Sequence, residues 1–508
     1  MLIILIGSIA ATCYVMHTKQ ENGQNKQFYV GVTYCGSSIQ EAKELIDKVK
    51  DYTNLFVLQS GLLMSNAPAI YEIGDYACAA NLSYAVYGSK DSTYSINNWL
   101  LEAKERWGTQ FIGIYYNDEP GGNMIDNQTA VLVQTRDENN ISTYIAKGAD
   151  GSIQFEKNNY TVSNVSVNTK YFIDGRIIIT KWYPYEDGEE TQTVGDITIG
   201  VQKQKSDTIK YYPDGTITIE ETTTEYEIHY KKDENNNRFI TSSGDCKITS
   251  NFYMSGNITK YPHQIPPYEE VAKQNPIQTV DDAAEIFVNG TKEFLKKINI
   301  EQLHEKSITV LTADYGLYWW DYKSGYDVIL AELGWNHTIA QDIGLVRGAA
   351  TAQGKSWGTI ITWKYDQPPY LPNGEEMYEQ LKTSYEAGAE YVIIFNYSEN
   401  QENHNTLQEE HFQALEQFWN NVVQNPKIKH GNIKAEAVLI LPQNYGWGMR
   451  NPDDTIWGIW PANETTQQIW NQLQNKIDKH GLKLDIIYED PNYPITNKYN
   501  NIYYWNQK

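Results

Sequence analysis

An alternation of predicted strands and helices, interrupted once, limits the folds open to this chain more than any other feature of its 508 residues. The predicted strands are 28–34, 54–59, 82–87, 111–116, 308–312, 326–332, 358–363 and 391–396. The predicted amphipathic helices include 39–51, 96–107, 280–298, 338–352, 375–387 and 408–423. The strands are almost continuously apolar, as in sheets covered on both faces, and eight of them with intervening helices match a (β/α)8 or TIM barrel. We therefore predict an α/β fold with a discontinuous TIM barrel, and a doubly wound open sheet is the alternative.

The interruption, residues 125–265, follows a different pattern. Apolar and polar residues alternate with a period of two in segments such as 216–220 and 226–230. Asp-Gly pairs, which are strong signals for β-hairpins, begin at Asp150, Asp174, Asp187 and Asp214. We predict an inserted antiparallel all-β domain that leaves the barrel after its fourth strand, at the end where active sites lie.

These patterns divide the chain into five segments. Residues 1–26 are predicted to be a signal peptide or N-terminal anchor plus a linker, 27–124 the first half of the barrel, 125–265 the insert, 266–428 the second half, and 429–508 a small C-terminal α/β unit. The last unit has predicted strands at 435–441 and 484–488 and a helix at 464–480.

The N-terminal segment predicts export to the extracellular space or the cell surface. Residues 1–16 form an apolar run shorter than the ~20 residues of a membrane span, which favours a signal peptide over a retained anchor. Three of the four cysteines lie beyond this run and permit at most one disulfide. Sequons for N-glycosylation agree with a glycoprotein, and they begin at Asn81, Asn127, Asn140, Asn159, Asn164, Asn257, Asn289, Asn336, Asn396 and Asn463.

The charge balance excludes several partners. The chain has 64 acidic and 41 basic residues, for a net charge of −23. Such a surface repels phosphate backbones and anionic lipids, so we expect no nucleic-acid partner and membrane contact only through the possible N-terminal anchor. Aromatic residues make up 13% of the chain, which is explained either by large cores or by sugar-binding surfaces.

The most informative motif ends the predicted fourth strand and reads Tyr115-Tyr-Asn-Asp-Glu-Pro-Gly-Gly122. A barrel places its catalytic side chains at this position. Together with the eight-strand pattern, the motif resembles the clan of barrel glycoside hydrolases in which Asn-Glu-Pro ends strand 4 and its Glu is the acid/base. The resemblance implies that Glu119 is the proton donor. Two features differ from the clan: Asp118 separates Asn117 from Glu119, and the seventh strand, Ile360-Ile-Thr-Trp-Lys-Tyr-Asp366, lacks the nucleophilic Glu. A loop acid before a turn proline is the structural alternative.

Cleavage of a glycosidic bond needs a second carboxyl group, ~5–5.5 Å from the first for retention and ~6.5–9.5 Å for inversion. Glu332, which ends the sixth strand, is the first choice, and Asp314, which ends the fifth, is the second. We therefore predict Glu119, Glu332 and Asp314 as catalytic residues. Proximity of such acids would raise one pKa, as a proton donor requires.

Aromatic and polar residues at the same strand ends are predicted to bind sugar, because flat rings stack on C–H faces while acids and amides bond the hydroxyls. The predicted substrate-binding residues are Tyr34, Tyr116, Asn117, Asp118, Trp319, Trp320, Trp335, Asn336, Trp363 and Asp366. Packing against the insert is the alternative explanation for the rings.

Motifs for a nucleophile, a cofactor or a metal are absent or lie in the wrong structural setting. Gly354-Lys-Ser-Trp-Gly358 matches a nucleophile elbow but runs from helix into strand, the reverse of what the elbow needs. The nine histidines include no zinc-binding spacing, which argues against a zinc site. Acidic loops such as Asp233-Glu-Asn-Asn-Asn237 could hold calcium, but they lack a regular calcium-loop signature. We predict neither a metal nor a cofactor. We predict an exported glycoside hydrolase-like protein that acts on poly- or oligosaccharide. The alternative is a non-catalytic cell-surface protein that uses the barrel for carbohydrate binding or assembly.

Overall fold

The computed structural model describes residues 27–61, 63–88, 93–126, 129–136, 141–148, 153–159, 166–171, 176–194, 197–232, 238–255, 277, 279–335, 338–397, 406–494 and 499–507. The predicted export segment lies outside these ranges. Within them, every helix is too short or too polar to span a bilayer.

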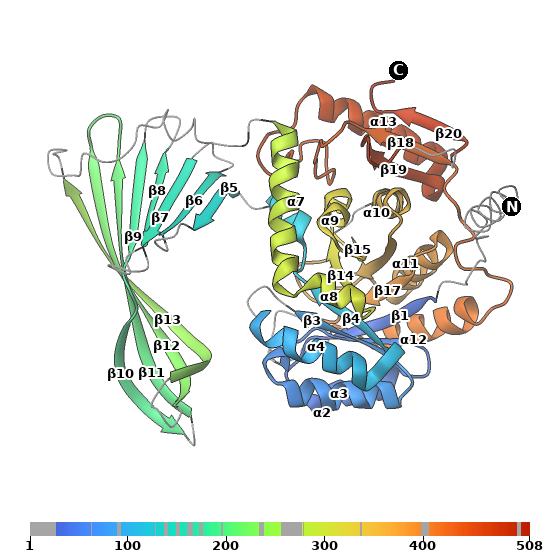
Figure 1. Cartoon of the computed structure of the whole chain (residues 1–508), viewed down its shortest axis with the longest axis horizontal. Helices are drawn as coiled ribbons and strands as arrows, with labels where there is room; N and C mark the ends of the chain where they lie inside the picture. The colour runs from blue at the N-terminus through green and yellow to red at the C-terminus, as the bar shows by residue number, and fades with distance from the viewer. Residues whose placement is uncertain are drawn as a thin grey trace, which may run out of the picture. The chain divides into compact units, whose positions relative to one another are not determined.

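Eight parallel strands close into a barrel in the order β1-β17-β16-β15-β14-β4-β3-β2 (Figure 1). The strands are β1 (Tyr29–Tyr34), β2 (Leu55–Leu58), β3 (Ser83–Gly88), β4 (Phe111–Tyr116), β14 (Thr309–Asp314), β15 (Val328–Leu333), β16 (Ser356–Ile361) and β17 (Tyr391–Ile394). Each one overlaps a predicted strand. The closed ring confirms the TIM barrel and rules out the open doubly wound sheet.

Helices surround the barrel and connect its strands (Figure 1). They are α2 (Ile39–Val49), α3 (Ala67–Ala79), α4 (Thr93–Trp107), α7 (Val280–Lys297), α8 (Ile300–Glu305), α9 (Tyr318–Ser324), α10 (Ile339–Gln353), α11 (Gly374–Ala387) and α12 (Glu409–Phe418). Local capping fixes several ends: the Ser38 side chain accepts from the Glu41 N–H at the start of α2, and Asn373 does the same for Glu376 at the start of α11.

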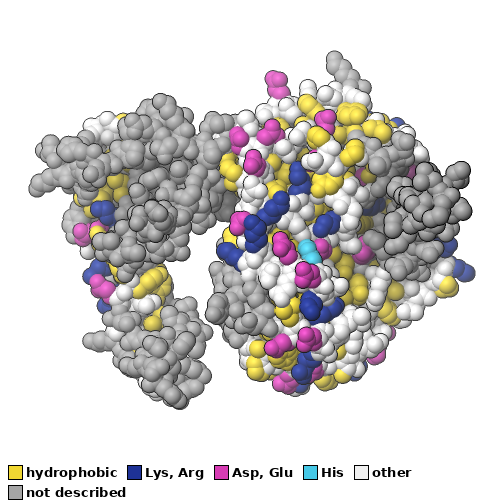
Figure 2. Space-filling model, viewed as in Figure 1, with side chains coloured by type: hydrophobic (Ala, Val, Ile, Leu, Met, Phe, Trp, Pro, Cys, Tyr) yellow, Lys and Arg dark blue, Asp and Glu magenta, His cyan; other side chains and the backbone are white. Residues whose placement is uncertain are grey.

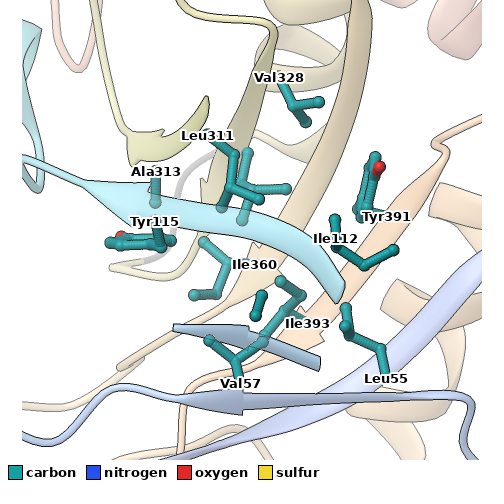
Figure 3. Packing of buried hydrophobic residues seen from close by; sticks show 12 residues of the cluster. Leu55, Val57, Ile112, Tyr115, Leu311, Ala313, Val328, Ile360, Tyr391 and Ile393 are labelled. Carbon is teal, nitrogen blue, oxygen red and sulfur yellow. The ribbon is translucent and has the colours of Figure 1, made fainter. Parts of the chain in front are cut away.

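The barrel interior is a packed apolar core (Figure 3). Its buried side chains are Leu55, Val57, Ala85, Ile112, Tyr115, Leu311, Ala313, Val328, Leu330, Ile360, Tyr391 and Ile393. Because side chains fill the interior, a ligand can bind only at the ends of the strands.

The insert is a nine-stranded sheet, sheet B, in the order β13-β12-β11-β9-β8-β7-β6-β5, with β10 paired to β11. Its strands, antiparallel where they pair, are β5 (Thr129–Arg136), β6 (Ile141–Gly148), β7 (Ile153–Asn159), β8 (Ser166–Tyr171), β9 (Ile177–Trp182), β10 (Glu186–Val194), β11 (Ile197–Tyr211), β12 (Ile217–Lys232) and β13 (Arg238–Ser255). It leaves the barrel sequence after β4, as predicted.

The predicted Asp-Gly turns have different outcomes. Asp214 and Gly215, the latter at φ 86°, form the turn between β11 and β12. The Asp187 prediction is wrong, because this residue lies inside β10, next to a shift in the register with β11. An extra residue in a strand can be accommodated as a bulge without ending the pairing. Asp150 and Asp174 lie outside the described residues.

A third sheet, sheet C, is parallel and comprises β18 (Ala437–Leu441), β19 (Leu484–Tyr488) and β20 (Asn501–Tyr504), with α13 (Glu464–His480) preceding β19. The buried Arg347 of α10 pairs with Asp485 of β19 at 2.7 Å.

The chain forms two compact units. One comprises the residues up to Pro120, Thr291–Leu441 and the residues from Asn471, and the other comprises Gly121–Gly290 and Pro442–Trp470. The barrel strands and sheet C belong to the first unit, and sheet B belongs to the second.

Charges are dispersed over the unit that contains the barrel. Figure 2 shows Lys and Arg side chains interspersed with Asp and Glu over its visible face. Exposed ion pairs such as Lys43–Glu72 at 2.6 Å and Lys483–Glu436 at 2.8 Å are examples in this unit. Such pairs contribute little to stability, and surface charge does not single out a site here.

Candidate active site

Strand β4 contains a bulge just before the predicted motif. Its pairing with β3 shifts, because Tyr84 pairs with Phe111 whereas Ala85 pairs with Gly113. Gly113 has φ 157°, and a Cβ at this position would overlap the carbonyl oxygen of Thr309 on β14, so glycine is required. Ile112 and Tyr115 both face the barrel interior. An unbroken alternation from Ile112 would turn Tyr115 outward, so the bulge directs this ring toward the interior.

The loop after β4 is tied to the strands on both sides. The Asn117 N–H donates to the Gly88 carbonyl at 3.2 Å, and the Glu119 N–H donates to the Ala313 carbonyl at 3.0 Å. The Thr312 hydroxyl donates to the Asn117 carbonyl at 2.8 Å. Asn117 and Glu119 have φ values of 58° and 49°, a backbone region that is costly for residues other than glycine. The hydrogen bonds to β3 and β14 therefore hold Glu119 in a strained turn.

Glu119 and Glu332 meet at the carboxyl ends of β4 and β15. Val328 and Leu330 face the barrel interior, so the alternation of the strand turns Glu332 inward as well. The two glutamate carboxyl groups are hydrogen-bonded to each other. Glu332 is 5% exposed, whereas Glu119 is partly exposed. The structure thus brings together the first two predicted catalytic residues.

One member of this pair holds a proton. Burial raises the pKa of Glu332 well above its usual range, and the charges of Glu119, Asp118 and Asp314 raise it further. Two carboxyl groups in contact cannot both be charged without a large energetic cost. Of the two, Glu332 is therefore the member whose protonated form is favoured, and in that form it is the donor of the pair. A protonated acid beside an accepting carboxyl group is suited to general acid–base chemistry.

Asp118, the residue that departs from the resembled motif, lies beside the pair. The Tyr115 hydroxyl donates a hydrogen bond to Oδ1 of Asp118. Burial raises the pKa of Asp118 to about 7, with Glu119 also raising it and the Tyr115 bond opposing the shift. Cys35 follows β1 and is close enough for Asp118 to act on it: burial raises the pKa of its thiol to about 12, and the aspartate adds to the effect. The site therefore contains a third acid that titrates near neutrality.

Asp314, the third predicted catalytic residue, belongs to a separate pair. Leu311 and Ala313 face the barrel interior, so Asp314 lies on the outer side, where its carboxyl group acts electrostatically on Asp321 of α9. Both carboxyl oxygens of Asp321 are buried without a hydrogen-bond partner. Both aspartates are 0% exposed. Oδ1 of Asp314 also accepts the backbone N–H groups of Tyr315 at 2.8 Å and Gly316 at 3.1 Å. Burial, and then Asp314, raises the pKa of Asp321 well above its usual range, so its protonated form is favoured.

Tyr318 lies among these acids. Burial raises the pKa of its phenol, and Asp342, Asp314, Glu332 and Asp321 all raise it further. Its hydroxyl and Oδ2 of Asp342 are buried without a hydrogen-bond partner. Together with Asp314 and Asp321, these groups form a buried polar layer that sequence reasoning did not detect.

Trp363 is the centre of an aromatic group at the carboxyl ends of β15, β16 and β17. Its ring centroid lies 6.2 Å from that of Trp335, 4.9 Å from Tyr370, 6.5 Å from Phe395 and 6.0 Å from Tyr397. Its Nε1 donates to the Tyr397 carbonyl at 2.9 Å, and the Trp335 N–H donates to the Trp363 carbonyl at 2.9 Å. Trp335 is 42% exposed and follows the strand that carries Glu332. The exposed ring is thus supported by rings behind it.

Four other aromatic residues predicted to bind sugar are buried. Tyr34, Tyr116 and Trp320 are 0% exposed and Trp319 is 2% exposed. The Tyr34 hydroxyl donates to the Ser38 carbonyl at the start of α2. Trp319 and Trp320 pack against Tyr488 of β19. The structure corrects these predictions, because the four rings pack within the protein and present no surface to a ligand.

The remaining predicted polar residues are dispersed. Asn117 and Asp118 lie in the loop of the acid pair, Asp366 is exposed beyond β16, and Asn336 lies outside the described residues. The sequon at Asn396 is also corrected. Asn396 is 0% exposed, and its Oδ1 accepts the N–H groups of Thr406 and Leu407 at 2.8 and 3.1 Å, so it cannot carry a glycan in the folded protein.

Some site residues escaped sequence reasoning. Tyr397 could have been found, since it follows β17 as Trp363 follows β16, and strand ends are where a barrel builds its site. Asp321 and Asp342 gave no comparable signal, because each lies within a helix and comes close to other acids only through tertiary packing.

Comparisons add no functional information. No known family model matches the chain, and no curated protein shows significant similarity to it. Across the ranges that the structure describes, no group of three or more His, Cys, Asp and Glu side chains is arranged to hold a metal ion. A functional interpretation therefore has to come from the acids and rings themselves.

Proposed function

We propose that this protein hydrolyses glycosidic bonds in oligo- or polysaccharides at the carboxyl ends of β4 and β15. The observation that supports this most directly is the hydrogen-bonded pair of Glu119 and Glu332. Glycosidases need two carboxyl groups in opposite protonation states, and the unequal burial of these two provides that difference. The exposed face of Trp335 offers a surface on which a sugar could stack. The predicted export segment would place this activity outside the cell.

We assign the proton donor to Glu332 and the nucleophile to Glu119, the reverse of the roles implied by the strand-4 motif. Burial favours the neutral form of a carboxylic acid, and Glu332 is the more deeply buried member. In this scheme Glu332 protonates the glycosidic oxygen as the C–O bond breaks, while Glu119 forms a bond to the anomeric carbon. Glu332 then takes a proton from the water that releases the sugar from Glu119.

The close contact favours retention of anomeric configuration. Inversion needs ~6.5–9.5 Å between the carboxyl groups so that a water molecule fits, and a hydrogen-bonded pair is closer even than the ~5–5.5 Å of retaining enzymes. A substrate therefore has to part the two groups, and we expect the partly exposed Glu119 side chain to rotate. NMR of the first sugar released distinguishes the two outcomes, and an inverted product would contradict this assignment.

A leaving-group series tests the roles. Wild type, Glu119→Gln and Glu332→Gln are compared on aryl glycosides with activated and poor leaving groups. An activated aryl group departs without protonation, so we expect Glu332→Gln to keep activity on that substrate and lose it on the poor one. Glu119→Gln should lose activity on both. Asp366→Asn, an exposed acid beyond a neighbouring strand, is the control.

The opposite pattern would restore the roles implied by the motif. No turnover by wild type on a panel of aryl glycosides and polysaccharides would instead support a non-catalytic carbohydrate-binding or assembly protein.

A further inference from the structure

Sheet B has two chemically different faces along β11. Gln202, Gln204 and Ser206 alternate with Lys203, Lys205 and Asp207, and alternate residues of a strand lie on opposite faces. The neighbouring strands preserve this division, because paired residues in an antiparallel sheet share a face. Asp207 pairs with Lys181 of β9 and with Glu221 of β12, and Lys203 pairs with Glu225. One face is therefore rich in charge.

The opposite face is uncharged along the middle of the same stretch, although Asp187 of β10 pairs with Gln202 at one end. Ser206 pairs with Trp182 of β9 and with Thr222 of β12, Gln204 pairs with Thr224, and Gln202 pairs with Tyr226. We call six of these residues the uncharged face: Trp182, Gln202, Gln204, Ser206, Thr224 and Tyr226. Charge therefore returns at both ends of this face, at Asp187 on one side and at Glu220 and Lys210 on the other.

The uncharged face is open to solvent. Its six residues are all partly exposed, and on the other side of the strand Lys205 is exposed, so both faces of this stretch meet solvent. Tyr185, 53% exposed, extends the face, with its ring centroid 6.0 Å from that of Tyr226. Exposed aromatic rings beside amides and hydroxyls are not needed to keep a sheet soluble. Their grouping on the side with fewer charges therefore indicates a binding surface.

We propose that the uncharged face of sheet B binds a neutral polysaccharide chain. Aromatic rings stack on the C–H faces of sugars, and the glutamine and hydroxyl side chains can bond sugar hydroxyls. A neutral polymer needs no counter-charge, whereas an anionic polymer would meet the acidic residues Asp187 and Glu220 at the two ends of this face and no cation between them. The stretch from Gln202 to Ser206 extends over about 13 Å at the rise of a β-strand, which accommodates about two sugar rings. This inference stands independently of the proposed hydrolase activity.

Binding of the full-length protein to insoluble polysaccharides tests the proposal. Cellulose, chitin and starch granules are the neutral probes, and a pectate gel is the anionic one. We expect wild type to bind at least one neutral probe, and Trp182→Ala combined with Tyr185→Ala to weaken that binding about tenfold or more. Tyr185→Ala alone, at an exposed position, should lower binding without changing thermal unfolding. Lys205→Ala on the charged face is the matched control and should bind as wild type does.

Three outcomes would overturn the proposal: no binding to any neutral probe, binding to pectate alone, or unchanged binding by the double variant. Measuring the same polysaccharide binding with the Glu119→Gln variant tests this proposal separately from the proposed hydrolase activity. Binding that depends on Trp182 and Tyr185 in a protein without hydrolytic activity refutes only the hydrolase. Hydrolysis of small aryl glycosides with binding unaffected by the double substitution refutes only the polysaccharide site.

Discussion

The two acid pairs of the barrel, Glu119–Glu332 and Asp314–Asp321, are alike in chemistry and different in surroundings. Each brings two carboxyl groups together, and burial raises the pKa of one member well above its usual range. The aspartates are 0% exposed, and Asp314 is also held by two backbone N–H groups, whereas Glu119 is partly exposed. The difference follows from the alternation of side chains along each strand, which turns Glu332 toward the barrel interior and Asp314 away from it. Only the glutamate pair is placed to meet a ligand, and we interpret the aspartate pair as structural.

The largest expected effect is on catalysis, and it should separate the pairs. Glu119→Gln should lower kcat/KM on an oligosaccharide by at least ~10²–10⁴-fold, because it removes a group that acts directly on the reacting atoms. Asp321→Asn should stay within a few-fold of wild type, since both aspartates are 0% exposed and cannot meet a substrate. Steady-state kinetics on one substrate measures both variants. Equal losses would show that the aspartate pair belongs to the catalytic machinery.

The second effect is on stability, and here the aspartate pair should matter more than the glutamate pair. Asp314→Ala leaves the Tyr315 and Gly316 N–H groups without their acceptor, and each buried unsatisfied group costs about 1–3 kcal/mol. We therefore expect the free energy of unfolding to fall by about 3 kcal/mol or more. Glu119→Ala, at a partly exposed position, should cost less than about 1 kcal/mol. Urea unfolding followed by tryptophan fluorescence compares the two, and similar values would remove the structural role of the aspartate pair.

The third effect is a dependence of stability on pH. Asp118 has its pKa raised to about 7 in the folded protein, so between pH 4 and 7 it is protonated when folded and ionised when unfolded. Its contribution to stability is therefore complete below the ordinary aspartate pKa and is lost as pH rises to about 7, by about 1.4 kcal/mol per pH unit. Burial makes Glu332 and Asp321 act in the same direction.

Asp118→Asn isolates this contribution. The variant should lose part of the fall in unfolding free energy between pH 5 and 7, by up to about 1.4 kcal/mol per pH unit, whereas the exposed Asp366→Asn should follow the wild-type slope. Urea unfolding at several pH values provides the slopes. A wild-type slope in Asp118→Asn would mean that Asp118 is ionised in the folded protein.

The fold could be predicted from the sequence more completely than the site. Eight apolar runs bounded by amphipathic helices were enough to predict the barrel strands, because strand and helix periodicities are local properties. The same apolar runs do not show which alternate residues of a strand face the barrel interior, because a strand that is buried on both faces is apolar on both. Glu332 and Asp314 both lie at the carboxyl-terminal end of a strand and seemed equivalent for that reason. The bulge at Gly113, which turns Tyr115 inward, depends on contact with Thr309 of β14 and left no local signal.

Aromatic residues show the same limit. Trp319 and Trp335 each follow a barrel strand within five residues and looked equally suited to bind sugar. Trp319 is covered by Tyr488 and Tyr493, which come from a distant part of the sequence, whereas Trp335 remains 42% exposed. Burial by a distant segment cannot be inferred from the residues around either tryptophan.

The smallest expected effect concerns Trp335, and it tests whether the surface beside the glutamate pair binds substrate. Trp335→Ala removes an exposed ring, so the free energy of unfolding should change by no more than about 0.5 kcal/mol. If the ring stacks on a sugar, KM for an oligosaccharide should rise about tenfold, equivalent to ~1.4 kcal/mol of binding, with kcat little changed. Tyr365→Ala is the matched control, because Tyr365 is exposed to the same 42% and lies two residues beyond Trp363. A rise in KM for Trp335→Ala alone would extend the binding surface from Glu332 along the end of β15. Equal KM values for both variants would confine recognition to the loop that carries Asn117 and Asp118.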